Sequence, residues 1–224
     1  GFDPINDIWG RSDILSKIDG ARTILPINSI DCNLYPLFGP DARRTLADFQ
    51  VLLPALAPRL STKIVVIPLL VSSAPNTDVE KKEVAKTLGE IIAIASPLGL
   101  RIALETEMPI DELLLYVDSF RSPTIGVCYD IGNCTSYGFD CPADIRTLGH
   151  RVFVVHVKDR KVGSEQSVLL GTGGANFDAC FRALKEIKYQ GAYTLQAWRG
   201  EDYLTDAAAQ LSFVRNKLNT VYDT

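Results

Sequence analysis

The sequence has few of the features that mark membrane proteins or nucleic-acid-binding proteins. Its longest apolar runs, such as "IVVIPLLV" at 64–71, are far shorter than the roughly 18 residues that a membrane helix needs. No charged-then-apolar leader opens the chain. Lys and Arg number 23 against 27 Asp and Glu and form no basic run, which disfavours phosphate-rich partners. We expect a cytoplasmic protein that binds neither membrane nor nucleic acid.

Cysteine and histidine form few informative patterns in this sequence. The five cysteines form no CxxC pair, and an odd number cannot all pair with one another. This favours reduced thiols over a disulfide framework. The chain has two histidines, and both lie in "HRVFVVHVKD" at 150–159.

What the sequence does contain is an alternation of short β-rich runs and amphipathic helical segments. With 224 residues, 46% of them hydrophobic, the chain can bury one core, and we expect a single domain over 1–224. Several of the β-rich runs are almost continuously apolar, as parallel strands covered on both faces are. The candidate strands are 2–9, 23–30, 63–70, 101–107, 124–130, 152–159 and 193–198.

The helical segments have recognisable starts and stops. One is expected from Asp78 to the break before Pro97. Asn176 is predicted to cap a second helix that Gly191 closes, and Thr205 to cap the last one. The residues of that last helix expected to face inward are Ala207, Leu211, Val214 and Leu218.

Regular β-then-α order implies a parallel sheet, either closed into a (β/α)8 barrel or open and doubly wound. The open nucleotide-binding form has weak support, because "GTGG" at 171–174 lacks the GxGxxG spacing. A barrel needs eight strands and about 250 residues, whereas we count seven candidates. We therefore predict an α/β chain with the TIM barrel fold whose first β/α unit is missing.

Polar residues fall at the ends of four successive candidate strands. Glu105, Asp130, His156 and Gln196 each lie near the carboxyl end of a strand. In a β/α barrel those ends form the mouth of the active site. Two carboxylates, an imidazole and an amide oxygen suit one divalent metal ion, namely Mn²⁺, Mg²⁺, Co²⁺ or Zn²⁺.

Each of these residues also has an ordinary structural interpretation. A histidine at a strand end is commonly a hydrogen-bonded structural group. An aspartate before Gly-Asn, as Asp130 is, commonly forms a turn. The metal site is favoured because the residues occupy equivalent positions, and burying ionisable groups is costly unless something neutralises them.

The motifs "ALETE", "CYDIGN", "VVHVKD", "LLGTGGANF" and "TLQAWRG", in this order, resemble the xylose isomerase-like barrel superfamily, in particular its sugar and sugar-phosphate isomerases and epimerases. The opening "GFDPI" is similar to that family's entry into its second strand, which agrees with a missing first unit.

The resemblance implies that Glu105, Asp130 and His156 bind the metal and that Gln196 stands where the family has a second Glu. Because an amide cannot take up a proton, this departure affects proton transfer more than metal binding. The implied reaction is proton abstraction beside a carbonyl, through an enediolate, on a sugar, sugar phosphate or keto-cyclitol. Glu105 is the candidate base, with Glu107 and Lys158 as further catalytic candidates, and one-base isomerisation is favoured over two-base epimerisation.

Four residues are candidates for binding the carbohydrate substrate. Gly173 and Gly174 could hold a phosphate on backbone N–H groups, although glycine clusters are more often turns. Arg199 could bind an anionic or carbonyl end, and Asn133 follows Asp130 in "CYDIGN". Two other classes stay open: a degenerate barrel that binds a metabolite or partner, and a phosphodiester-cleaving relative, which two histidines and an acidic balance disfavour. A homo-oligomer is compatible with all of these.

Overall fold

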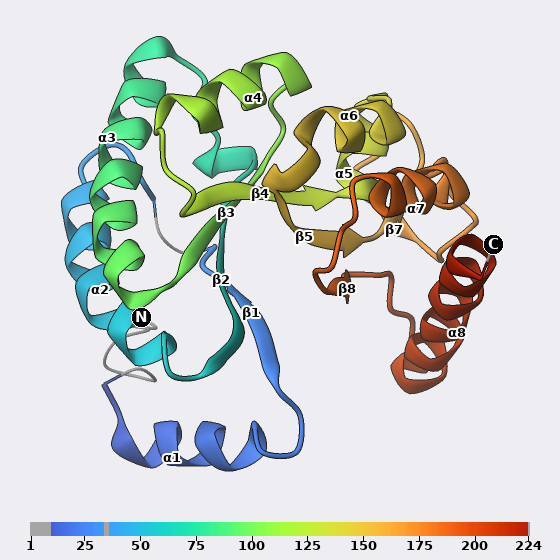
Figure 1. The fold of residues 1–224 in the computed structure, drawn as a ribbon, viewed down its shortest axis with the longest axis horizontal. Coiled ribbons are helices and arrows are strands. Elements are labelled where there is room, and N and C mark those ends of the chain that lie inside the picture. Colours follow the sequence, from blue (N-terminus) through green and yellow to red (C-terminus); the bar gives the residue numbers. More distant parts are fainter. Residues whose placement is uncertain (1–9, 34–35, 224) are drawn as a thin grey trace. The chain divides into compact units, whose positions relative to one another are not determined.

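The computed structural model describes residues 10–33 and 36–223. The first candidate strand, at 2–9, lies outside the described residues. The chain divides into two compact units, and the single-domain organisation stays a prediction (Figure 1). The first unit is Gly1–Thr106 with Phe120–Gly126, and the second is Glu107–Ser119 with Val127–Thr224.

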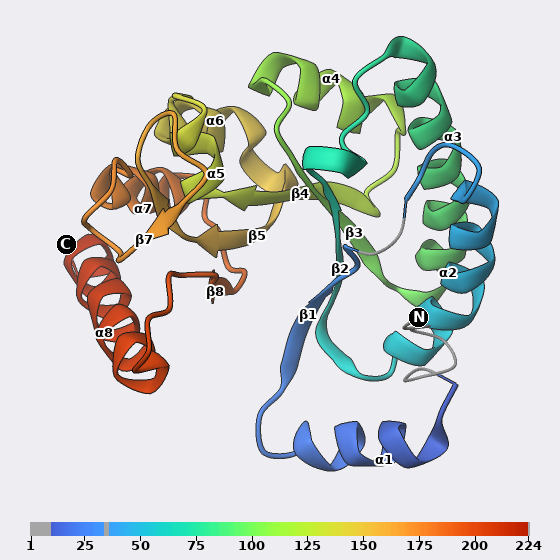
Figure 2. The same cartoon turned by 180° about the vertical axis from the view of Figure 1, so that it is seen from behind.

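The first unit contains parallel strands and the helices that follow them. Strand β2 lies between β1 and β3 and pairs in parallel with both. Helices α2 and α3 run side by side in both views (Figures 1 and 2). The elements are α1 (Ser12–Ala21), β1 (Ile27–Asp31), α2 (Ala42–Leu56), β2 (Leu60–Leu69), a 3-10 turn (Val71–Ser73), α3 (Asp78–Ala95), a second 3-10 turn (Ser96–Leu98) and β3 (Arg101–Thr106).

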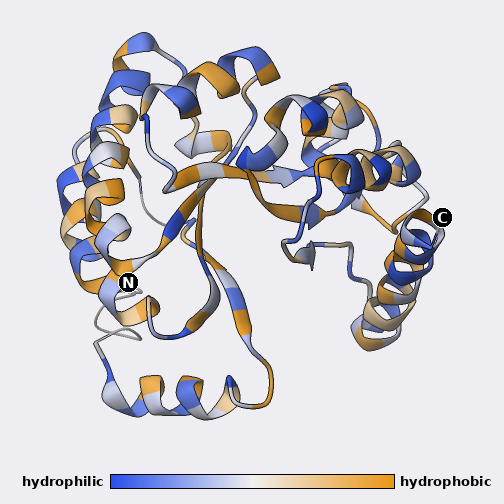
Figure 3. Cartoon of the chain, viewed as in Figure 1, coloured by the Kyte–Doolittle hydropathy of each residue, from blue (hydrophilic) through white to orange (hydrophobic). Residues whose placement is uncertain are grey.

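The predicted helix from Asp78 is confirmed as α3, and local chemistry explains both of its ends. The Thr77 hydroxyl accepts the N–H of Glu80, and the Glu80 carboxylate accepts the N–H of Thr77, which forms a capping box. At the other end Gly99 adopts a left-handed conformation with φ 66°. Hydropathy alternates along α2 and α3, as expected for helices that bury one face (Figure 3).

The second unit contains the carboxyl-terminal part of β4, followed by β5 and β8. β5 pairs in parallel with both of the others, and β6 and β7 form a small antiparallel ladder. The elements are α4 (Ile110–Ser119), β4 (Ile125–Asp130), α5 (Ile131–Ser136), α6 (Cys141–Leu148), a 3-10 turn (Gly149–Arg151), β5 (Val152–Val157), β6 (Asp159–Arg160), β7 (Ser167–Val168), α7 (Phe177–Glu186), β8 (Tyr193–Leu195) and α8 (Tyr203–Tyr222). Every residue of β4 and of β5 is buried, which confirms the prediction of covered parallel strands.

Two predicted helix boundaries in the second unit are wrong. Asn176 caps α7 as expected, through a bond from the Ala179 N–H, but the helix ends at Glu186 rather than at Gly191. Lys188 turns the chain there with φ 57°, which is uncommon outside glycine. The last helix is capped by Asp202, whose carboxylate accepts the N–H of Thr205.

The buried face of α8 also differs from the prediction. Val214 is buried as expected, but Leu211 is 39% exposed and Gln210 is only 4% exposed. Gln210 is drawn inward because its amide makes two bonds to backbone, donating to the Trp198 carbonyl and accepting from the Leu170 N–H. Binary patterning treats glutamine as a surface residue and therefore misplaces the face.

The cysteines behave as the sequence predicts. All five lie in the described part of the chain, are buried, and form no disulfide. Within the described residues, no helix has the length and apolar character needed to cross a membrane.

Candidate active site

The carboxyl ends of β4 and β5 bring Asp130 and His156 together in the second unit. The two residues are direct partners in the parallel register, so their side chains share one face of the sheet. His156 Nδ1 lies 3.8 Å from Asp130 Oδ2, and each side chain is only 1% exposed. A buried carboxylate and a buried imidazole at the end of parallel strands form the centre of the candidate site.

Asp130 has a second role as the N-cap of α5. Its Oδ1 atom accepts the backbone N–H of Asn133 at 2.8 Å, which leaves Oδ2 directed toward His156 and Lys158. Lys158 Nζ lies 2.8 Å from Oδ2 and donates to Asn133 Oδ1 at 3.2 Å. One buried polar network therefore joins three of the predicted site residues, Asp130, Asn133 and Lys158, beside His156.

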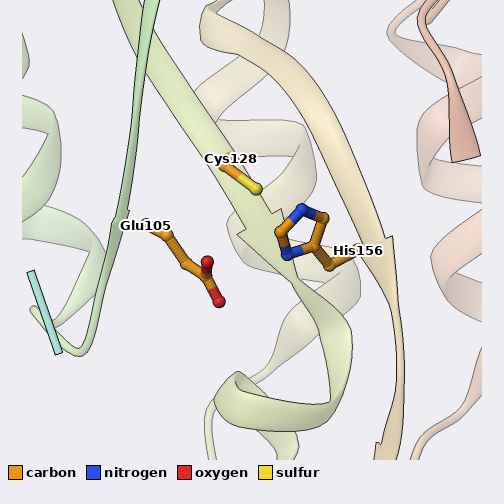
Figure 4. A group of neighbouring side chains, drawn as sticks. All are labelled: Glu105, Cys128 and His156. Carbon is orange, nitrogen blue, oxygen red and sulfur yellow. The ribbon is translucent and has the colours of Figure 1, made fainter. Parts of the chain in front are cut away.

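Cys128 is a site neighbour that sequence reasoning missed. It lies two residues before Asp130 on the same face of β4. The Sγ atom of Cys128 lies within 4.8 Å of a ring nitrogen of His156. Figure 4 shows the thiol and the ring pointing toward one another. The strand periodicity of "CYD" could have signalled this, but a cysteine inside a buried strand is usually a small apolar residue.

The two glutamates of "ALETE" fall in different units. Glu105 is the penultimate residue of β3 in the first unit, is 3% exposed, and is labelled in Figure 4. Glu107 opens the second unit and is half-buried beside Tyr137. Burial, followed by a hydrogen bond with Glu107, raises the pKa of the Tyr137 hydroxyl. Glu107 is thus engaged with Tyr137.

A cavity of about 610 Å³ opens beside Lys158 in the second unit. Gln196 and Arg199, both exposed, line it together with Trp198 and Ser167. The Gln196 N–H donates to the Val157 carbonyl just beyond the end of β8, so the pairing with β5 extends to this residue. That register puts the Gln196 side chain on the face that carries His156 and Lys158.

The glycine-rich loop is folded around a carboxylate of the chain itself. Asp159, which is fully buried, accepts the backbone N–H groups of Gly171, Gly173 and Ala175 at 2.9 to 3.1 Å. The N–H of Gly174 donates to the Arg160 carbonyl at 2.9 Å. Both amides thus have acceptors within the fold, so the predicted phosphate site on Gly173 and Gly174 stays a prediction that requires a phosphate to displace Asp159 and the Arg160 carbonyl.

Asp159 is a residue whose importance the sequence analysis missed. A Cβ placed on Gly173 would collide with Asp159 Oδ1 and lie 2.8 Å from the Arg160 carbonyl oxygen, so this position requires glycine. The sequence does contain a signal of this arrangement. An aspartate directly follows "VHVK", and a cluster of glycines comes after the short β6–β7 ladder. Backbone amides that converge on a concave loop bind anions, and here a buried side chain supplies the anion.

A close approach also fixes the stem of Lys158. A Cβ on Gly132 would meet Lys158 Cγ at 2.7 Å and the Lys158 Cβ and carbonyl carbon at 2.8 Å. We expect Gly132→Ala to lower the free energy of unfolding by about 1–3 kcal/mol, because α5 or Lys158 must shift to admit the methyl group.

The matched control for Gly132 is Gly89→Ala in α3, where nothing lies within 4 Å of an added Cβ. This change should raise the free energy of unfolding by about 0.5–1 kcal/mol, because glycine is a poor helix residue. Urea denaturation of both variants checks the pair. Equal effects in the two variants would contradict the close approach at Gly132.

The donors of the second unit fit a divalent metal ion. A carboxylate oxygen and an imidazole nitrogen converge at 3.8 Å inside a buried site, and an amide side chain shares their face. Oxygen and nitrogen donors of this kind bind Mn²⁺, Mg²⁺, Co²⁺ and Zn²⁺. The residues present are therefore compatible with the metal that the sequence predicts.

Comparisons with known proteins agree with this architecture. The xylose isomerase-like TIM barrel family model matches residues 15–217. An L-ribulose-5-phosphate 3-epimerase (UlaE) of Escherichia coli O1:K1 / APEC is 31% identical over 135 residues. That match covers 58% of this chain and 46% of the relative, so the chain spans about half the length of the curated relatives that it matches.

Solved structures share the fold at low sequence identity. A D-tagatose 3-epimerase-like protein has a TM-score of 0.78 at 20% identity, over 95% of this chain and 85% of that one. A xylose isomerase-like TIM barrel protein from Mycobacterium smegmatis, in complex with magnesium, has a TM-score of 0.73 at 19% identity, over 95% and 80% of the two chains. These likenesses show the fold, and the family match over residues 15–217 shows that the chain belongs to the xylose isomerase-like TIM barrel family.

Proposed function

We propose that this protein is a divalent-metal-dependent isomerase or epimerase of a sugar, a sugar phosphate or a keto-cyclitol. The observation that carries the proposal is the buried pair of Asp130 and His156 at the carboxyl ends of adjacent parallel strands, which Lys158 connects to a cavity of about 610 Å³. A cavity of this volume falls in the range of small-molecule sites. The similarity to a sugar-phosphate epimerase supports a carbohydrate as the substrate.

The metal ligands in this proposal are Glu105, Asp130, His156 and Gln196. Glu105, Asp130 and His156 each lie in the last two residues of their strands, which is where β/α barrels collect functional groups. The magnesium-bound relative supports a divalent ion as cofactor. When bound, such an ion polarises a substrate carbonyl and makes the neighbouring carbon more acidic.

Glu105 is the proposed base that takes the proton from that carbon. Its carboxylate is 3% exposed, and a base sheltered from water retains the proton long enough to return it. Gln196 has neither charge nor a titratable proton, so a second acid or base is lacking at its position. One-base isomerisation on a single face of the substrate is therefore favoured over two-base epimerisation.

Lys158 and Arg199 are proposed to bind the anionic or carbonyl end of the substrate. Both line the cavity, and no other cationic side chain of the described residues is among those that line it. They replace the glycine loop as the candidate phosphate site, because the loop amides already bind Asp159. Asn133 is held by Lys158 and can present its amide to a hydroxyl group.

Deuterium wash-in tests the proposed reaction directly. Incubation in D₂O with Mn²⁺ and a panel of ketoses, keto-cyclitols and their phosphates should introduce deuterium beside the carbonyl of at least one compound, detected by mass spectrometry. Glu105→Gln should reduce that exchange at least about a thousandfold, because the amide cannot accept the proton. Exchange that survives in Glu105→Gln would remove Glu105 from the role of base.

Gln196 favours one alternative function, a barrel of this family that binds a carbohydrate without converting it. The change Gln196→Glu separates the two functions. If the site is otherwise complete, the added carboxylate should create or raise 3-epimerisation activity, read by chromatography of the epimeric products. If the parent and the variant both bind sugar and metal but neither exchanges deuterium, the binding function is supported.

A further inference from the structure

We propose that Lys158 is a built-in counter-ion, which holds Asp130 in the metal-free protein and turns into the 610 Å³ cavity when a divalent metal binds. This inference rests on the proposed function, since it requires that Asp130 is a metal ligand. It adds that the metal displaces the Lys158 ammonium from Asp130, and it assigns this displacement to the Lys158 side chain alone.

The first support is the position of the ammonium group. Lys158 Nζ lies 2.8 Å from Asp130 Oδ2, the same oxygen that lies 3.8 Å from His156 Nδ1. The Asp130 and Lys158 side chains are 1% and 10% exposed. The ammonium and the imidazole therefore both lie near the same carboxylate oxygen, the one that Asp130 would offer to a metal held together with His156.

The second support is the energetic balance of the buried carboxylate. Asp130 Oδ1 is already bound by the N–H of Asn133, so Oδ2 carries the charge that needs compensation inside the protein. Burial of an uncompensated carboxylate is costly, and a buried ion pair offsets that cost. Lys158 therefore allows the site to fold before any metal is present, but it also competes with the metal for the same oxygen.

The third support is that only the end of the side chain can move. Gly132 packs against the Cβ, the Cγ and the backbone of Lys158, which fixes the stem under the start of α5. Lys158 is also one of the residues that line the cavity, together with Gln196 and Arg199. We expect the outer methylenes to rotate and carry the ammonium from Asp130 into this space, where it can meet an anionic group of the substrate.

The test compares metal affinity in three proteins. The Kd for Mn²⁺ is measured by isothermal titration for the parent chain, for Lys158→Met and for Lys161→Met. Lys158→Met removes the competing charge of a buried ion pair and should tighten Mn²⁺ binding by about tenfold to a hundredfold. Lys161 is exposed, and Lys161→Met should leave the Kd unchanged.

A second measurement detects the movement itself in the unmodified protein. Brief acylation with an amine-reactive ester, mapped by mass spectrometry, should modify Lys158 slowly without metal and at least about fivefold faster at saturating Mn²⁺, because the ammonium leaves its buried ion pair. Lys161 serves as the internal reference and should react at the same rate in both states. This readout does not depend on the folding of any variant.

The outcomes separate the two levels of the proposal. Equal Mn²⁺ affinity in the parent and in Lys158→Met, with unchanged labelling of Lys158, would overturn the counter-ion role and leave the metal site intact. No Mn²⁺ binding in any of the three proteins, with Zn²⁺ giving the same result, would overturn the metal-dependent function and this inference with it. Tighter binding in Lys158→Met together with metal-dependent labelling supports both.

Discussion

Asp159→Ala should lower the free energy of unfolding of the second unit by about 3 kcal/mol or more. Its carboxylate is fully buried and accepts three backbone N–H groups, from Gly171, Gly173 and Ala175. Each of these part-buried hydrogen bonds to a carboxylate contributes about 1.5–3 kcal/mol, and the alanine methyl group replaces none of them. Chemical denaturation monitored by circular dichroism measures the loss.

Asp140→Ala is the matched control for this prediction. Asp140 also accepts a backbone N–H, but only that of Ala143 and in an exposed position at the start of α6. Its removal should cost about 1 kcal/mol, as is usual for an N-cap. If Asp159→Ala proves no more damaging than Asp140→Ala, then Asp159 does not organise the glycine loop.

His156→Ala should weaken Mn²⁺ binding at least about a hundredfold and abolish deuterium exchange, because it removes the one nitrogen donor of the proposed ligand set. Loss of groups that merely support a ligand already costs 10–100-fold in metal affinity, so loss of the ligand itself must cost at least as much. Isothermal titration with Mn²⁺ and the exchange assay check the two effects separately.

The chain supplies its own control for this substitution in His150→Ala. His150 lies in the 3-10 turn that precedes β5, at the opposite end of the strand from His156. His150→Ala should leave the affinity for Mn²⁺ within about twofold of the parent value. A comparable loss of Mn²⁺ binding in both variants would show that the effect of His156→Ala comes from damage to β5 and not from a lost ligand.

The strands were predictable because their physical signal is strong. The apolar runs around Val65, Ala103, Val127 and Val154 become β2, β3, β4 and β5, and all four residues are buried. Parallel strands covered on both faces leave nearly uninterrupted apolar sequence, so their ends, where polar residues appear, are also visible. The placement of Asp130 opposite His156 follows from those ends and from the parallel register.

Loop and helix details were less predictable because they depend on partners distant in sequence. Asp159 binds amides 12 to 16 residues further along the chain, so its role is visible only when "KDR" is considered together with the glycine cluster that follows it. Gln210 is buried because the Trp198 carbonyl is near, not because of helical periodicity. The same is true of Lys158, whose close partner Asp130 lies on another strand.

Two loops of the second unit differ in how freely their residues can be exchanged. The loop from 171 to 175 has its amides committed to Asp159, so most substitutions there are first changes in stability. Gln196 and Arg199 present exposed side chains to the cavity, on a segment whose main chain is fixed independently by Val157 and Gln210. Substrate preference can therefore be redesigned at Arg199 without rebuilding the scaffold, whereas substitutions in the glycine loop act on stability before they act on recognition.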